Sequence, residues 1–265
     1  MTTTDPTPPG APSPMAARTP EARAFTAERR VRWGDVDVTG RLRLDGLARH
    51  LQDVANDDVR DAGLDAGAPF VVRRTTVAVE RMPVTGEVVA LTTFCGGLGS
   101  RWAERRTTIT GDRGARVETA SLWVCVDPTT GRPSRLEDAF LATYTDAAAG
   151  RRVRANLHHP GPPPGGHRRP WPLRSTDVDP LGHVNNAATW EPVEDELARR
   201  RRRAVRATIE YRAAIAPDDE VDLVVADGPI DGSGPGTTPA DVLSLWLVVD
   251  GDVRASVEAH LHPDP

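Results

Sequence analysis

One pattern occurs twice in the chain and constrains its fold more than any other feature. The first copy reads Arg32-Trp-Gly-Asp-Val-Asp-Val-Thr-Gly40, and the second reads Arg174-Ser-Thr-Asp-Val-Asp-Pro-Leu-Gly182. Both copies have the form Arg-x-x-Asp-Val-Asp-x-x-Gly, with the second lying 142 positions after the first (Arg174 against Arg32). A pattern of this length that recurs once in each half indicates a duplicated structural unit. The sequence therefore predicts two related units.

A segment rich in proline and glycine separates the two copies. Its densest part is the run Pro-Gly-Pro-Pro-Pro-Gly-Gly at 160–166, which is typical of a linker. We therefore expect a linker at 148–170, an N-terminal unit at 25–147 and a C-terminal unit at 171–265. Residues 1–24 are rich in proline, threonine and alanine, and they lack the pattern of a secretory signal. Their low apolar content predicts a disordered tail.

The same order of elements follows each copy of the pattern. In the first unit, Leu44, Leu47, Leu51 and Val54 recur at the three- and four-residue spacing of a helix, and Gly63 is a plausible stop. The corresponding helix of the second unit is expected at about 184–200. Strands are predicted at 70–81, 87–96, 101–110 and 116–126 in the first unit, and at 205–214, 220–225, 241–250 and 254–261 in the second. Each unit is thus predicted to be α+β, with one long helix packed on a curved antiparallel sheet.

The composition excludes several classes of function. The chain has 265 residues and a net charge of -5, which argues against a nucleic-acid partner. No stretch approaches the ~18 consecutive apolar residues that a membrane-spanning helix needs. The two cysteines, Cys95 and Cys125, do not have the spacing of a metal site. We expect them to be buried free thiols in a reducing cytoplasm, and we expect no metal and no cofactor.

The residues with the most chemical potential lie just after the repeated Asp-Val-Asp of the second unit. The segment reads Asp177-Val-Asp-Pro-Leu-Gly-His-Val-Asn-Asn186 and precedes the predicted helix. Backbone N–H groups at a helix N-terminus are unpaired and electropositive, so they can stabilise an oxygen that gains negative charge. We expect Gly182 and His183 to supply such groups, with Asp179 in reach of the bound carbonyl. His183 is expected to orient the substrate or to transfer protons.

Helix capping is the competing explanation for the polar residues around Asp179. Asp177 and its counterpart Asp37 are interpreted as structural residues, because aspartate before a helix is a common cap. Asn185 and Asn186 could either cap the helix or take part in catalysis, and the residues by themselves leave both options open.

Several stretches resemble known proteins. The run from Asp179 to Asn186 resembles the motif at the start of the helix in hot-dog-fold thioesterases. The first half resembles a narrower family, the acyl-ACP (acyl carrier protein) thioesterases of plants and bacteria. The matching stretches are residues 40–53, 71–83 and 122–133, together with Ile209-Glu-Tyr-Arg212 in the second half. The resemblance extends over about residues 28–261. It implies two tandem hot-dog units, of which the first lines the acyl-chain site and the second carries catalysis.

The resemblance places the catalytic aspartate of the family on Asp179 and its catalytic histidine on His183, and Asn185 is the third candidate site residue. Three positions depart from the plant-type pattern. Leu181 replaces an asparagine, Thr189 replaces an aromatic residue, and Ala214-Ile215 replaces a Glu-Cys pair. In the first half, Arg41 stands where His183 stands in the second. The first unit is therefore predicted to carry a degenerate copy of the catalytic motif.

A run of five arginines, at Arg199, Arg200, Arg201, Arg202 and Arg203, closes the predicted second helix. Cations are favoured at a helix C-terminus, so the run could be no more than a solvated helix end. It could also bind the phosphate of phosphopantetheine or an acidic carrier protein.

These observations predict a thioesterase that hydrolyses fatty acyl-ACP, with Asp179 as general base or nucleophile at a helix N-terminus. An acyl-CoA thioesterase is the first alternative, because both carriers present the same pantetheine arm. The second is a non-catalytic acyl-binding or regulatory protein, which the departures from the family pattern motivate. A homodimer is possible, because exposed sheet edges can pair.

Overall fold

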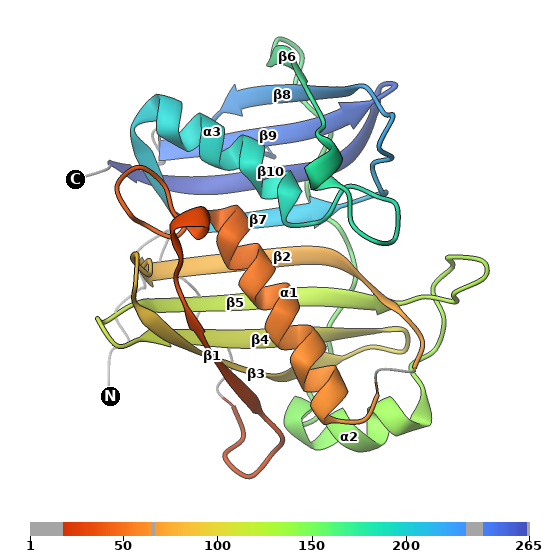
Figure 1. Ribbon diagram of the computed structural model, residues 1–265. Helices are drawn as coiled ribbons and strands as arrows, with labels where there is room; N and C mark the ends of the chain where they lie inside the picture. Colours follow the sequence, from red (N-terminus) through yellow and green to blue (C-terminus); the bar gives the residue numbers. More distant parts are fainter. Residues whose placement is uncertain (1–17, 65–66, 232–240, 264–265) are drawn as a thin grey trace, which may run out of the picture.

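The computed structural model describes residues 18–64, 67–231 and 241–263 of the chain. Most of the predicted disordered tail therefore lies outside the described residues. Within the described part, ten strands form one antiparallel sheet in the order β1-β3-β4-β5-β2-β7-β10-β9-β8-β6. Figure 1 shows two helices, α1 and α3, on the same face of this sheet.

Each unit contributes five strands to the sheet. The elements of the first unit are β1 (Phe25–Arg30), η1 (Trp33–Asp35), α1 (Leu44–Asp61), β2 (Phe70–Arg81), β3 (Val88–Leu98), β4 (Trp102–Gly111), β5 (Arg116–Cys125) and α2 (Asp138–Ala148). Those of the second are β6 (His167–Trp171), η2 (Ser175–Asp177), η3 (Ala188–Trp190), α3 (Glu191–Arg200), β7 (Arg202–Tyr211), β8 (Val221–Asp227), β9 (Val242–Val249) and β10 (Asp252–Pro263).

The two units meet where β2 pairs with β7 in the middle of the sheet. Thr76 lies opposite Thr208 in this pairing, and their hydroxyl oxygens are 3.1 Å apart. On either side of this contact the strands follow in mirrored order, with β5, β4, β3 and β1 on one side and β10, β9, β8 and β6 on the other. This arrangement agrees with the α+β fold of two tandem units expected from the internal repeat.

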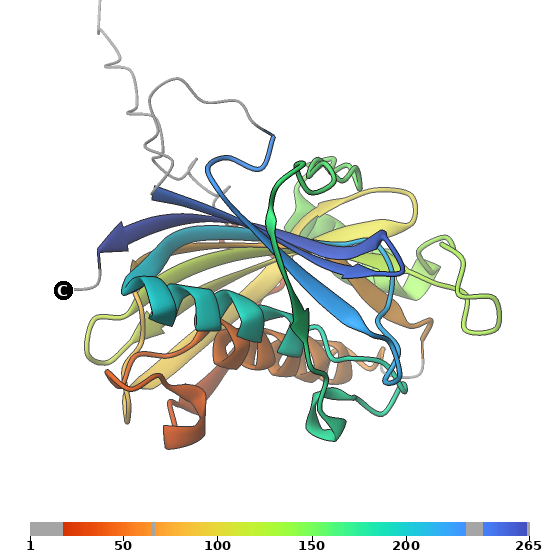
Figure 2. The same ribbon diagram turned by 90° about the horizontal axis from the view of Figure 1, so that it is seen from above.

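The main core lies between the two helices and the concave face of the sheet. The spaced leucines of α1 are buried there, as the periodicity predicted, together with Val193 and Leu197 of α3. Figure 2 shows the sheet curving over both helices. Burial of one apolar stripe per helix against an apolar sheet face supplies most of the stabilising surface.

The linker crosses the opposite, convex face of the sheet. The backbone N–H groups of His158 and His159 both donate to the carboxylate of Glu210 on β7, at 2.9 Å. The indole Nε1 of Trp246 on β9 donates to the carbonyl of Pro160 at 2.8 Å. These bonds hold the linker on the second unit. Its last residues, from His167 on, pair with β8 as the edge strand β6.

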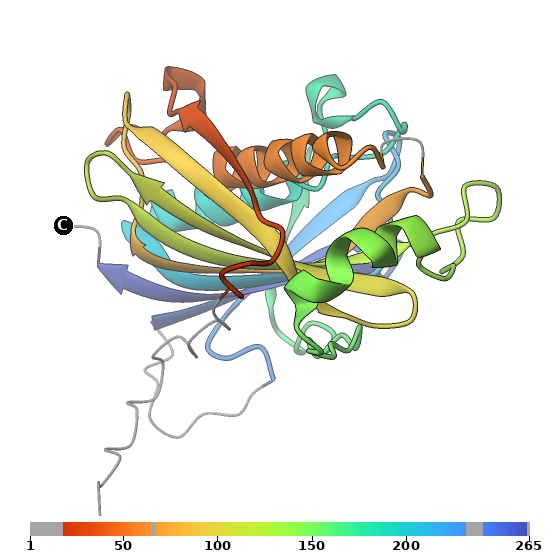
Figure 3. The same ribbon diagram turned by 90° about the horizontal axis from the view of Figure 1, so that it is seen from below.

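Two helices differ from the sequence-based prediction. The second helix begins at residue 188, with η3 leading directly into α3, and not at residue 184. The reason is that Val184 forms a β-bridge with Val178 and donates its N–H to the carbonyl of Ile215. The helix α2 was not predicted at all. It packs against β3 with Tyr144, Ala147 and Ala148 buried, at the lower right of the view in Figure 3.

Two further observations concern the cysteines and the helices. Cys95 and Cys125 are free and buried, as predicted. No helix in the described ranges is both long enough and apolar enough to cross a membrane.

Candidate active site

Asp179 and His183 face each other across a tight hairpin turn. The N–H of Asp179 donates to the carbonyl of His183 at 2.9 Å, and the N–H of Gly182 donates to the carbonyl of Asp179 at 2.9 Å. Gly182 has φ +78°, which residues with a side chain rarely adopt. The sequence Asp-Pro-Leu-Gly suits this turn, because Asp, Pro and Gly are favoured at its first, second and fourth positions. Directly opposed residues of a hairpin project to the same side, so the turn brings the two side chains together.

Only one of the two carboxylate oxygens of Asp179 accepts a hydrogen bond within its own turn. Its Oδ1 accepts a hydrogen bond from the backbone N–H of Leu181 at 2.9 Å, which fixes the side chain. Its Oδ2 has no hydrogen-bond partner among the described residues, and the side chain is partly exposed. One oxygen is thus anchored while the other remains free to act on a bound molecule.

Both side chains line a cavity of about 600 Å³ to which the two units contribute. From the second unit come Asp179, Leu181, His183, Asn186 and the segment Tyr211–Ala214. The first unit supplies Val71, Val72 and Arg73 of β2, Arg101 and Trp102 before and in β4, and Val124 and Val126 at the end of β5. A cavity of this size holds a drug-sized ligand. Neither unit would form it without the other.

The charge at this cavity is opposite in sign to that of the whole chain. Asp179 is the one acidic residue among its described lining residues, whereas Arg73, Arg101 and Arg212 are basic. Burial, followed by repulsion from Arg212, lowers the pKa of Arg73. An arginine remains charged despite such a shift. The cavity therefore favours anionic ligands in a chain whose net charge is -5.

The structure separates the roles of the two asparagines that the sequence left open. Asn185 does not line the cavity; its Oδ1 accepts the N–H of Ala187 at 2.8 Å, and its own N–H donates to the carbonyl of Asp177 at 2.7 Å. Asn186 lines the cavity, and its side-chain amide has no partner in the described ranges. A catalytic role for Asn185 therefore stays a prediction, while its Oδ1 is used in a local turn.

The expected position at a helix N-terminus is corrected. Eleven residues of turn, bridge and 3-10 helix separate Asp179 from α3, because residues 178 and 184 pair as strand. The N–H of Gly182 is already used within the turn, so it cannot donate to a bound carbonyl. The N–H of His183 has no partner among the described residues and remains available, as does the side chain of Asn186.

The first unit contains the same turn, but both oxygens of its carboxylate accept hydrogen bonds. The N–H of Asp37 donates to the carbonyl of Arg41 at 2.8 Å, and Gly40 has φ +83°. Here, however, Oδ1 accepts three bonds from Thr39 and Arg41, and Oδ2 accepts one from Arg41 Nε at 3.0 Å. Burial alone would raise the pKa of Asp37, but these hydrogen bonds lower it below its ordinary value. Both oxygens of this carboxylate are therefore occupied.

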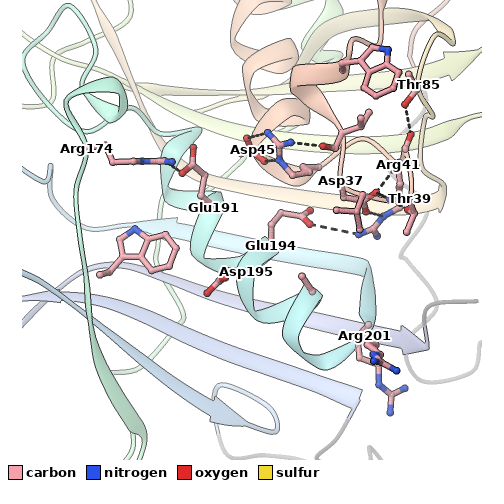
Figure 4. Close-up of a pocket in the computed structure, with 18 residues that line it drawn as sticks. Asp37, Thr39, Arg41, Asp45, Thr85, Arg174, Glu191, Glu194, Asp195 and Arg201 are labelled. Carbon is pink, nitrogen blue, oxygen red and sulfur yellow. Dashed lines mark hydrogen bonds and ion pairs between the residues drawn. The ribbon is translucent and has the colours of Figure 1, made fainter.

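A groove of about 1150 Å³ adjoins Asp37, and ion pairs cover its carboxylates. Figure 4 shows Arg41 extending between Asp37 and Glu194 of α3, and Arg174 reaching Glu191. Asp45 is paired with Arg43 and Arg49. The groove holds no carboxylate comparable to Asp179 among these residues, which supports a structural role for the first copy of the turn.

The run Arg199–Arg203 lies far from the cavity that contains Asp179. Arg202 begins β7 and Arg212 follows its last residue, so the length of a ten-residue strand, roughly 30 Å, separates them. Arg199 is paired with Asp195, and Arg200 is paired with Glu196 and Asp227. Arg201 and Arg202 line the groove near Asp37. The sequence therefore missed the arginines that are close to Asp179, although Arg73 and Arg212 lie within the stretches that carried the resemblance.

Comparisons with known proteins agree with this geometry. The model of the acyl-ACP thioesterase N-terminal domain matches residues 22–144, and that of the acyl-ACP thioesterase C-terminal domain matches residues 165–248. An uncharacterized protein of Mycobacterium tuberculosis strain H37Rv, Rv2001, is 31% identical over 245 residues, which cover 91% of this chain and 94% of that protein.

Two solved structures share the whole fold. An acyl-ACP thioesterase from Bacteroides thetaiotaomicron superposes with a TM-score of 0.73 at 17% identity, covering 90% of this chain and 98% of the other. The 12:0-ACP thioesterase from Umbellularia californica gives a TM-score of 0.73 at 19% identity, with 91% and 97% covered. At these identities the superpositions establish the tandem hot-dog fold.

Proposed function

This chain belongs to the acyl-ACP thioesterase family, a family of thioester hydrolases, and from that premise we propose that Asp179 and His183 hydrolyse its acyl thioester substrate in the cavity between the two units. The single observation that carries this proposal is the free Oδ2 of Asp179. It belongs to a fixed carboxylate that lines the cavity, while the matching carboxylate of Asp37 has no free oxygen.

In the proposed reaction the thioester carbonyl lies beside the Asp179–His183 turn. The N–H of His183 and the side-chain amide of Asn186 donate to the carbonyl oxygen as it gains negative charge. As a general base, Asp179 Oδ2 takes a proton from a water molecule, whose oxygen attacks the carbonyl carbon. As a nucleophile, Oδ2 attacks the carbonyl carbon itself to form a mixed anhydride, which a water molecule then hydrolyses to regenerate the carboxylate. In both routes the carbon–sulfur bond breaks, the carrier leaves as a thiolate and the free acid is the product. The imidazole of His183 orients the substrate or transfers protons.

Hydrolysis in water enriched in ¹⁸O separates the two routes for Asp179. A general base places the label in the released acid alone. A nucleophile also places label in the carboxylate of Asp179 when water opens the mixed anhydride at the Asp179 carbonyl, and mass spectrometry of the corresponding peptide after repeated turnovers would detect it.

We assign recognition of the carrier to Arg73, Arg101 and Arg212 in preference to the run Arg199–Arg203. These three residues line the cavity that contains Asp179, and guanidinium groups bind phosphate through paired hydrogen bonds. They also attract an acidic carrier protein to the cavity mouth. The run is about a strand length away, and two of its members are already neutralised by acidic neighbours.

The acyl chain is proposed to enter the first unit from this cavity. Val71, Val72, Val124 and Val126 provide an apolar wall at the ends of β2 and β5. We further place the protein in the cytoplasm, which the two free thiols support. Dimer formation stays a prediction; Arg29 and Arg30 on β1 and Pro170 on β6 are residue types that discourage pairing at sheet edges.

The decisive experiment is product analysis after incubation with a panel of acyl-ACPs and the matching acyl-CoAs. Release of free fatty acid, faster from acyl-ACP than from acyl-CoA, is the expected result. Faster release from acyl-CoA would move the assignment to an acyl-CoA thioesterase. Saturable binding of acyl-ACP without any hydrolysis would establish an acyl-binding protein and overturn the proposal.

A further inference from the structure

A second, smaller cavity lies directly behind the one that contains Asp179. It has a volume of about 30 Å³ and shares Val72, Asn186 and Tyr211 with the outer cavity. Its remaining walls come from α1, β2, β5 and the start of the second unit's helix: Ala48, Leu51, Gln52, Thr75, Ser121, Trp123, Ala187 and Trp190. Under the proposed function, an acyl chain that extends from the thioester into the first unit passes beside this inner cavity.

The walls of this inner cavity are more polar than an alkyl chain requires. Thr75 and Ser121 are both buried, and their hydroxyl oxygens are 3.0 Å apart. Each hydroxyl carries one hydrogen, and their mutual bond uses one of the two. The second hydrogen has no other partner among the described residues.

Trp123 provides the most telling observation. Its indole Nε1 is buried and has no hydrogen-bond partner in the described part of the chain. An indole N–H can only donate, and a buried tryptophan usually finds an acceptor. Gln52, on the facing helix, also has no hydrogen bond among the described residues. The walls of the inner cavity therefore include a buried N–H donor, Trp123 Nε1, that lacks an acceptor among the described residues.

A small oxygen-containing group would satisfy this N–H donor. The volume exceeds the ~10–15 Å³ that one water molecule requires, so the cavity fits a single hydroxyl or keto oxygen. An unsubstituted methylene at the same place would leave the N–H of Trp123 unpaired in an apolar surrounding, which is unfavourable. Sites built to hydrogen-bond a substrate oxygen discriminate strongly against analogues that lack it.

We propose that the inner cavity binds an oxygen substituent on the acyl chain, so that the preferred substrates are hydroxyacyl or oxoacyl thioesters. This inference rests on the proposed function, because it assigns a specificity site to the same hydrolase. Trp123 Nε1 donates to the substituent, and the Thr75–Ser121 pair and Gln52 complete its hydrogen bonds. The substituent takes the place of a water molecule that would otherwise fill the cavity.

The test compares acyl thioesters of equal length with and without a hydroxyl group. The probes are octanoyl, decanoyl and dodecanoyl thioesters of one carrier, each unsubstituted and as a series of isomers with the hydroxyl on successive carbons. For at least one isomer, kcat/KM should exceed that of the unsubstituted chain by about tenfold or more. If every unsubstituted chain is hydrolysed as well as or better than all of its hydroxylated isomers, the inference is wrong.

Trp123→Phe is the diagnostic variant, because phenylalanine keeps an aromatic ring and loses the N–H. It should lower kcat/KM for the preferred hydroxylated substrate about tenfold while leaving the unsubstituted chain unchanged or faster. An equal loss on both substrates would contradict a role in specificity. Ser121→Ala, which removes one hydroxyl without adding volume, provides a second readout of the same ratio should Trp123→Phe fold poorly.

The outcomes separate this inference from the proposed function. If Asp179→Asn abolishes hydrolysis of every substrate while the wild type prefers plain alkyl chains, the hydrolase assignment stands and the oxygen site fails. If no acyl thioester is hydrolysed at all, the proposed function fails first. Thermal shift of the wild type and of Trp123→Phe with free hydroxy and plain fatty acids gives a binding readout that needs no turnover, and selective stabilisation of the wild type by the hydroxy acids is expected.

Discussion

Arg41 Nε donates a hydrogen bond to Asp37 Oδ2 over 3.0 Å, and this contact distinguishes the first copy of the repeated turn from the second. The backbone of the two turns is the same, down to the positive φ of Gly40 and Gly182. In the second copy a histidine occupies the position of Arg41, and Asp179 Oδ2 has no partner among the residues that the structure describes. One backbone design therefore serves a structural ion pair in one unit and a proposed catalytic carboxylate in the other.

Replacing the aspartate of the turn with asparagine should abolish most activity in the second unit and leave activity unchanged in the first. Asp179→Asn should reduce kcat by about 100-fold or more, since a general base contributes ~10²–10⁴-fold, with little change in stability. Asp37→Asn is the matched control and should leave kcat/KM within about twofold. Steady-state hydrolysis of one acyl-ACP by both variants measures the difference. Wild-type rates for Asp179→Asn would exclude this residue from the chemistry.

The difference in stability between the wild type and the Asp37→Asn variant should depend on pH. The pKa of Asp37 is lowered in the folded protein, so its ionised form stabilises the fold above its ordinary pKa of 3.8. That contribution is lost as the pH falls through the lowered value. The variant should therefore be about 1 kcal/mol less stable at pH 7, and the gap should close in acid. Urea unfolding of wild type and variant across pH 3–7 tests this, and a gap that does not change with pH would contradict it.

His183→Arg should convert the second turn into a copy of the first. The introduced guanidinium would pair with Asp179 Oδ2 as Arg41 pairs with Asp37, and the carboxylate would no longer be free. We expect a loss of about 100-fold or more in kcat with the fold intact. His183→Gln, which cannot form the ion pair, serves as the comparison and should retain more activity. Equal activities of the two variants would show that an ion pair with the aspartate does not explain why the first unit is inactive.

Glu194 of α3 caps α1 across the unit boundary. Its replacement should show how much its buried negative charge lowers the stability of the fold. Its Oε1 accepts the N–H of Leu44 at 2.7 Å, and its burial raises its pKa above the ordinary 4.5. The folded state thus holds the proton more tightly than the unfolded chain, and ionisation of Glu194 lowers stability at neutral pH. Below about pH 4.5 both states are protonated and the cost disappears.

Glu194→Gln keeps an acceptor for Leu44 and removes the charge. The variant should be at least as stable as the wild type at pH 7, and its advantage should shrink as the pH falls towards the ordinary pKa of the carboxyl. Thermal unfolding at a series of pH values measures this. A variant that is much less stable at pH 7 would mean that the ion pair with Arg41 outweighs the burial cost.

Glu210→Ala should release the linker from the sheet. The carboxylate accepts the N–H groups of His158 and His159, and the alanine would leave both without their acceptor. We expect the free energy of unfolding to fall by about 2–4 kcal/mol, with Glu210→Gln intermediate because one acceptor remains. Urea unfolding measures the loss. An alanine variant as stable as the wild type would show that water replaces these contacts at no cost.

The sequence by itself determined the duplication, the α+β composition of each unit, most strand ranges and the start of α1, because these follow from local periodicity and from a repeated turn whose glycine must adopt positive φ. It could not determine that Val184 would pair with Val178 and delay the second helix, or that Asn185 would be used for a turn while Asn186 lines the cavity. Nor could it bring Arg73, Arg101 and Trp102 of the first unit to the cavity that contains Asp179. Those outcomes depend on contacts between residues far apart in the chain, which form only when β2 and β7 join the two units into one sheet. The roles of these side chains were therefore decided by tertiary packing.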